Sequence, residues 1–132
     1  MPSRRKKEVA YIISFLLYLA IFLMSSLPAS ALPAKLPDII PHFCEYAILA
    51  FFFIQTFNNP TNTKTMAIGL AWLILLSFLD ELHQMLVPSR FCSAKDLMFD
   101  TLGSLSGLTA YFLLRRWSVR RRADNRRSLD QE

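Results

Sequence analysis

The stretch VAYIISFLLYLAIFLMSSL, residues 9–27, decides the fold class of this chain. It contains no charged residue, no glycine and no proline. Its length falls within the range of about 17–25 residues that an α-helix needs to cross the hydrocarbon core of a bilayer. We therefore predict a membrane-spanning helix over residues 9–27.

Three further apolar segments follow, at residues 41–57, 66–86 and 97–115. Prolines and short polar clusters separate the segments, as is typical of turns between helices. One example is the sequence NNPTN at residues 58–62. The four segments predict an all-α fold, a compact bundle of four transmembrane helices that forms a single domain over all 132 residues.

The composition agrees with a membrane location. Hydrophobic residues make up 53% of the chain and charged residues 19%. A small soluble domain buries only a limited fraction of its surface and could not hide so many apolar side chains. A cleaved signal peptide is the alternative for the first segment, because the sequence around Ala29-Ser30-Ala31 resembles a cleavage site. The apolar stretch exceeds the about 7–15 residues of a signal peptide, so a retained span is favoured.

The positive charges stand at the two ends of the chain, and the net charge is +5. Four basic residues lie at positions 4–7, and seven lie between positions 115 and 127. Basic residues beside apolar segments mark the cytoplasmic side of a membrane, so both termini are expected to be cytoplasmic. We expect residues 120–132 to be a disordered basic tail. We expect no nucleic-acid partner, because the basic clusters fit juxtamembrane anchors.

Polar side chains gather at three of the predicted helix ends and in one loop. They are His42, Glu45 and Tyr46 at the start of the second segment, Asp80, Glu81, His83 and Gln84 at the end of the third, Arg90 in the next loop, and Asp96 and Asp100 at the start of the fourth. The helical spacing places most of each group on one face, but Glu81 is expected to point partly aside. In the predicted topology all these ends meet at the outer membrane surface. Ionisable residues in spans are costly, so these residues are candidates for function.

A purely structural interpretation stays open. The polar residues would then cap and join helix ends, with Arg90 as the counterion of Asp96 and Asp100. Gly103 and Gly107 form a G-x-x-x-G pair, which lets another helix approach closely. We expect that helix to belong to the same chain, although the same face could instead support an oligomer.

We predict no cofactor and no metal site. Several residues are of metal-binding types, namely His42, His83, Glu45, Asp80 and Glu81. However, the sequence contains neither H-E-x-x-H nor a pair of C-x-x-C motifs. Cys44 and Cys92 are expected near the outer side as buried thiols without a disulfide.

Three stretches carry a resemblance to a known family. They are Asp38-x-x-x-His42-Phe43-x-x-Tyr46-x-x-Leu49, Asp80-Glu81-x-x-Gln84-x-x-x-Pro88-x-Arg90, and Asp96-x-x-x-Asp100-x-x-Gly103-x-x-x-Gly107. In order and spacing they resemble the motifs of the VanZ-like family. The chain departs at Ile39, where the family usually has lysine, at Ser89, where it often has glycine, and at Asp100, where asparagine is common.

The resemblance implies a small multi-span protein of the bacterial cell membrane. The founding member is linked to low-level resistance to the glycopeptide teicoplanin, but the resemblance implies no particular reaction. We hypothesise that the polar residues bind the headgroup of an envelope lipid or a lipid-linked precursor. In this hypothesis Arg90 contacts phosphate, and the ligand is oriented by hydrogen bonds from His42, Tyr46 and Gln84.

Two alternatives remain. In the first, the protein is an enzyme that acts on such a lipid. Asp80 or Glu81 would then be the general base, and His42 or His83 its acid–base partner. This mechanism lacks an evident nucleophile. In the second, the protein is a structural helper of a membrane complex, bound through its glycine face.

Overall fold

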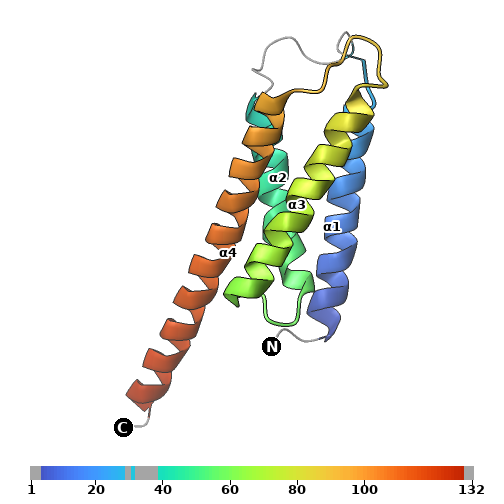
Figure 1. Ribbon diagram of the computed structural model, residues 1–132. Coiled ribbons are helices and arrows are strands. Elements are labelled where there is room, and N and C mark those ends of the chain that lie inside the picture. Colours follow the sequence, from blue (N-terminus) through green and yellow to red (C-terminus); the bar gives the residue numbers. More distant parts are fainter. Residues whose placement is uncertain (1–3, 29–30, 32–38, 130–132) are drawn as a thin grey trace.

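The computed structural model describes residues 4–28, 31 and 39–129, which form a bundle of four helices (Figure 1). The helices are α1 (Arg4–Ser25), α2 (Ile39–Phe53), α3 (Thr63–Gln84) and α4 (Ala94–Leu129), and a short 3-10 helix, η2 (Ile54–Thr56), prolongs α2. The described residues contain no strand. All four helices are long and apolar enough to cross a membrane, where α2 is counted together with η2. The predicted all-α bundle of four spans is therefore confirmed.

Local signals in the sequence set the ends of the helices. Pro41 stands in the first turn of α2, where the missing N–H group is tolerated. The side chain of Asn62 caps α3, because its oxygen accepts a hydrogen bond of 2.9 Å from the backbone N–H of Lys64. At α4, the hydroxyl of Ser93 accepts a hydrogen bond of 3.3 Å from the backbone N–H of Asp96.

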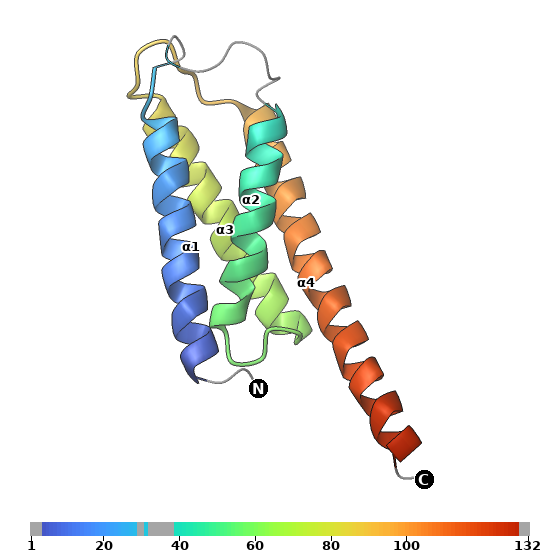
Figure 2. The same ribbon diagram turned by 180° about the vertical axis from the view of Figure 1, so that it is seen from behind.

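The two ends of the bundle differ. We call the end where α1 and α3 finish and α2 and α4 begin the polar end; it comprises residues 22–28, 39–46 and 77–100. The opposite end, here called the basic end, holds both termini (Figures 1 and 2). The last turns of α1 and α3 and the first turns of α2 and α4 lie at the polar end (Figure 2). The polar residues of three helices are therefore brought to the same end.

The closest helix contact joins α2 to α4. A Cβ atom at Gly103 would overlap with the backbone carbonyl of Phe43, and one at Gly107 would overlap with that of Ala47. Only glycine permits this approach, so the G-x-x-x-G pair packs within the chain and α2 covers its face. The buried apolar core surrounds this contact and consists of Ile21, Tyr46, Leu49, Ala50, Ile54, Leu73 and Leu108.

Large apolar side chains cover the outside of the bundle. Phe15 on α1, Trp72 on α3 and Leu113 on α4 are each more than half exposed. Such a surface would be costly in water, whereas lipid tails cover it without cost. The exposed apolar surface thus agrees with a protein that spans the membrane.

The C-terminal tail differs from our expectation. We predicted disorder from residue 120, but α4 continues as a helix to Leu129. Its 36 residues extend over about 54 Å, beyond the about 30 Å of a hydrocarbon core. Arginine is a good helix former, and this segment contains neither glycine nor proline. The guanidinium of Arg121 also lies 4.1 Å from the ring centre of Trp117, one turn earlier.

Candidate functional site

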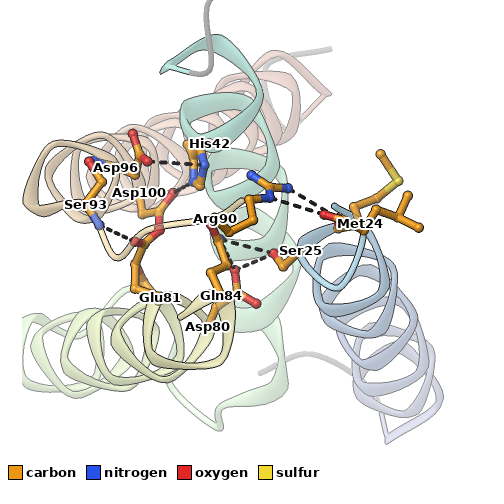
Figure 3. A network of polar contacts seen from close by, with 12 residues as sticks. Met24, Ser25, His42, Asp80, Glu81, Gln84, Arg90, Ser93, Asp96 and Asp100 are labelled. Atoms are coloured by element: carbon orange, nitrogen blue, oxygen red, sulfur yellow. Dashed lines mark hydrogen bonds and ion pairs between the residues drawn. The ribbon is translucent and has the colours of Figure 1, made fainter. Parts of the chain in front are cut away.

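A pair between His42 of α2 and Asp100 of α4 lies at the centre of the polar end (Figure 3). The His42 Nδ1 atom is 3.0 Å from Asp100 Oδ1, and the Ser77 hydroxyl of α3 donates a hydrogen bond to Asp100 Oδ2. Asp96, one turn before Asp100, places its Oδ2 atom 3.9 Å from His42 Nε2. Asp100 is completely buried, so this pair joins three helices away from solvent.

A second group forms where α3 meets α1. The Ser25 hydroxyl donates a hydrogen bond of 2.6 Å to Asp80 Oδ2. Gln84 donates one of 3.2 Å to the same oxygen. The other oxygen of Asp80, Oδ1, is buried and has no hydrogen-bond partner among the described residues. One oxygen of this carboxylate is therefore satisfied and the other is not.

Glu81 lies inside the bundle rather than aside. Its Oε2 atom accepts a hydrogen bond of 2.7 Å from the backbone N–H of Ser93, and its side chain points toward His42 and Asp100 (Figure 3). Its Oε1 atom is buried without a hydrogen-bond partner in the described part of the chain. We expected Glu81 to point partly aside, because successive residues of a helix point in directions about 100° apart. This was wrong, since the bundle surrounds α3 on both of these sides. Asp80 thus faces α1 while Glu81 faces α4, and both directions point into the bundle.

His83 is the α3 residue that lies apart from the others. Its ring stacks on Phe22 of α1 with 4.3 Å between the ring centres. Its Nε2 atom is 3.0 Å from the hydroxyl of Ser26. Of the two histidines, only His42 is thus placed among the buried carboxylates.

Arg90 binds the end of α1 instead of an acidic side chain. Its guanidinium donates hydrogen bonds of 3.3 and 3.4 Å to the backbone carbonyls of Leu27 and Met24. Met24 lies in the last turn of α1 and Leu27 just beyond it, and the partial negative charge at the C-terminal end of a helix attracts this cation. Within the described ranges Arg90 makes no ion pair with Asp96 or Asp100. The side chain that contacts Asp96 and Asp100 is His42 and not Arg90.

The residue before Arg90 has an unusual backbone conformation. Ser89 has a φ of 66°, in the left-handed region that favours glycine. The turn between α3 and α4 thus requires this conformation, and Ser89 adopts it at some cost in free energy.

Other residues of the predicted set also lie at or near the polar end. Tyr46 is fully buried one turn below His42, and its hydroxyl has no hydrogen-bond partner among the described residues. Glu45 is half-buried. Cys44 and Cys92 are free thiols, but both are exposed, which corrects our expectation of buried thiols. Asp38, the first residue of the first motif, lies outside the described residues.

Sequence reasoning missed the roles of three serines, although Ser93 had been considered as a nucleophile. The backbone of Ser93 and the side chains of Ser25 and Ser77 bind the carboxylates. Ser77 lies three residues before Asp80 and four before Glu81, so helical spacing could have placed it on the inward face. Ser25 follows an apolar run, and no signal in the sequence distinguishes it.

The site contains more acidic than basic groups. The carboxylates at the polar end are those of Glu45, Asp80, Glu81, Asp96 and Asp100, and the groups able to carry positive charge are His42, His83, Arg90 and Lys95. Such a site suits cations and hydrogen-bond donors. Ser77 binds the carboxylate of Asp100 rather than the imidazole of His42. The serine that contacts an imidazole is Ser26, whose partner His83 lies apart from the buried carboxylates, so the described residues do not form the triad of a serine hydrolase.

Comparison with known proteins gives one match. A protein family described as VanZ/LLP1 matches residues 9–115, which include all of α2, α3 and the polar end. No curated protein matches the chain, and no solved structure does.

Proposed function

The chain belongs to the VanZ/LLP1 family, and from this premise we propose that it binds a polar lipid headgroup at the polar end of its bundle. The lipid would be an envelope lipid or a lipid-linked precursor of the bacterial cell membrane. Both termini would then be cytoplasmic, and the polar end would face outward.

The observation that carries the proposal is a set of buried polar atoms without partners. The two that belong to carboxylates, Asp80 Oδ1 and Glu81 Oε1, both lie at the polar end. Buried polar groups in proteins almost always have hydrogen-bond partners, and an exception calls for an explanation. Carboxylate oxygens accept hydrogen bonds. A headgroup that carries hydroxyl or amine donors, such as a sugar or an amino alcohol, would satisfy them.

Arg90 supports recognition of the phosphate that joins such a headgroup to its lipid. A guanidinium has five N–H donors, and Arg90 uses two nitrogen atoms to bind α1. Donors therefore remain for a phosphate oxygen, which guanidinium groups bind strongly. Arg90 is half-buried beside the acidic cluster, so phosphate would bind at the edge of the site.

An apolar groove between α2 and α4 would hold an acyl chain of the same lipid. Its lining is Ala47, Ile48, Phe51, Phe52, Ser106, Gly107 and Ala110. Glu45, Ile48 and Phe52 follow the i, i+3, i+7 spacing of one helical face. The groove thus continues along the helix from a carboxylate of the polar end, as a lipid tail continues from its headgroup.

An enzyme that acts on the headgroup is the second candidate. The contact of 3.0 Å between His42 and Asp100 favours it, because a carboxylate that orients an imidazole is a common part of acid–base sites. Glu81 or Asp80 would then share the proton transfer. The third candidate, a structural helper of a membrane complex, does not require these buried acids.

Lipid binding and turnover can be measured together. Purified protein is reconstituted in liposomes made from bacterial envelope lipids, and bound lipid and released headgroup are followed by mass spectrometry. Asp80→Ala should lose the bound lipid, while Asp124→Ala, the same change on the exposed end of α4, should keep it. Turnover that Asp80→Ala abolishes would support the enzyme. Equal results for both variants, combined with unchanged teicoplanin susceptibility of cells, would reject both functions.

The orientation has its own test. A Ser89→Cys variant in a Cys44→Ser and Cys92→Ser background should react with a membrane-impermeant thiol reagent added to intact cells. Asn125→Cys, on the basic end, should react only after the cells are opened. The reverse pattern would place the polar end inside and would rule out an outward-facing site.

A further inference from the structure

We propose that His42, Glu81 and Asp100 hold a divalent first-row transition-metal ion at the polar end. The three residues come from α2, α3 and α4, and all are buried. Each offers one ligand atom, and these atoms lie within 4.8 Å of one another. Figure 3 shows their side chains pointing toward one another.

The free oxygen of Glu81 points to a ligand. Glu81 is only 1% exposed, and its Oε1 atom has no hydrogen-bond partner among the described residues. A metal ion satisfies the oxygen and the charge at the same time.

The charges around the three residues favour a cation. Glu81 and Asp100 together bring two carboxylates against the single imidazole of His42. Asp96 adds another carboxylate, 3.9 Å from the imidazole. Arg90, the nearby cation of the loop, is bound to the carbonyls of α1. The bundle therefore gathers negative charge at this point, and a divalent ion would balance it.

The types of ligand indicate which ion would bind. Imidazole suits zinc and other first-row metals, whereas magnesium and calcium prefer oxygen ligands. Ser77 binds Asp100, and Asp96 faces the second nitrogen of His42. Partners of this kind orient the ligands of metal sites. Zinc bonds of 2.0–2.2 Å would draw the three side chains closer together.

Three protein ligands leave a coordination position open. Catalytic zinc sites share this feature, since a water molecule or substrate takes the fourth position. A phosphate oxygen of the proposed headgroup would fit there. Binding of the headgroup phosphate to the metal rests on the proposed function, whereas the metal site itself does not.

The test uses the full-length protein without envelope lipids. The protein carries Cys44→Ser and Cys92→Ser, because exposed thiols also bind zinc. It is freed of metal with a chelator and placed in phosphatidylcholine nanodiscs. Zn²⁺ is added by equilibrium dialysis and counted by mass spectrometry, and we expect one ion per chain.

Two pairs of variants locate the ion. Glu81→Gln and His42→Gln should each lower the Zn²⁺ affinity at least about 100-fold, the upper range seen even for residues that only support ligands. Glu8→Gln and His83→Gln make the same changes outside the three ligands and should leave the affinity unchanged. Circular dichroism checks that each variant is folded. If Glu81→Gln and His42→Gln do not fold, X-ray absorption spectroscopy replaces them. The spectrum of Zn²⁺ bound to protein with all three ligands intact should show one imidazole among oxygen donors.

Several results would overturn the metal site. They are binding below one ion per chain, undiminished binding by folded Glu81→Gln, an equal loss in Glu8→Gln, or an absorption spectrum without imidazole. Because the nanodiscs contain no envelope lipid, such a failure leaves the proposed lipid binding untouched. Conversely, bound zinc without bound envelope lipid would reject the lipid proposal alone.

Discussion

The polar end of the bundle buries several of its charged side chains, whereas the basic end exposes them. At the polar end, Asp80, Glu81 and Asp100 are turned inward and are almost completely buried. At the basic end, the arginines of α4 are exposed or half-exposed and extend beyond the other helices. Arg116 and Arg121 there lie over the rings of Phe112 and Trp117 on their own helix.

The difference distinguishes charged residues that orient the protein in the membrane from charged residues that form a binding site. Exposed arginines next to a span need no partner in the protein, because water and lipid phosphates solvate them. Buried carboxylates need partners inside the bundle, and replacing a carboxylate together with all of its partners by apolar groups would avoid the cost of burial. Their presence at one end is therefore better explained by a ligand than by stability.

The largest effect is expected for Asp100→Leu. This change leaves His42 and Ser77 buried without their shared acceptor. Removing one partner of a buried pair lowers the free energy of unfolding by about 3 kcal/mol or more. Reversible unfolding in mixed micelles measures the loss.

Asp124→Leu is the control for this change, since Asp124 is exposed near the end of α4. Surface changes of this kind stay within about 0.5 kcal/mol. Equal losses in the two variants would show that burial does not distinguish the two ends.

Gly103→Ala should come next, with a loss of about 2 kcal/mol. The added methyl group would overlap with the backbone carbonyl of Phe43, which cannot move aside without shifting α2. Gly69→Ala is the matched control, because the nearest atom there is the flexible end of Ile54 at 3.0 Å. Since alanine also favours helices, Gly69→Ala should be close to neutral. A tolerated Gly103→Ala would show that α2 and α4 pack less closely at the polar end.

The sequence predicts the spans and the end at which the polar residues meet. Apolar length and punctuation are local properties, so residues 9–27 identify a span without any knowledge of the neighbours. Once four spans alternate in direction, the ends that carry His42, Asp80 and Asp96 must lie on the same side. Both results depend only on order along the chain.

The sequence does not predict the contacts inside the site. Glu81 faces α4 and His83 faces α1 because of how α3 is rotated, and in a membrane both faces of a helix are apolar. The residues of the proposed metal site likewise come from three helices, so no sequence motif joins His42 to Glu81. Arg90 donates hydrogen bonds to backbone carbonyls at the end of α1 and not to the acids nearest in the sequence. The conformation of the loop determines which groups its side chain contacts.

A pair of arginine variants compares the two ends directly. Arg90→Gln removes hydrogen bonds to two carbonyls of α1 and should lower the free energy of unfolding by about 1 kcal/mol. Arg122→Gln, on the exposed part of α4, should change it by less than about 0.5 kcal/mol. The same mixed-micelle unfolding applies. A larger effect for Arg122→Gln would mean that the basic end contributes to folding as well as to orientation.

The smallest effect is expected for Ser89→Gly, and it has the opposite sign. Ser89 adopts a φ of 66°, which costs a residue with a side chain about 1 kcal/mol relative to glycine. Glycine gains more freedom in the unfolded chain, so a net stabilisation of about 0.5 kcal/mol is expected. Ser89→Ala keeps the strained conformation and should give no gain. If Ser89→Ala stabilises the protein as much as Ser89→Gly does, the turn is not strained. The free-energy cost at the polar end would then come from its buried carboxylates alone.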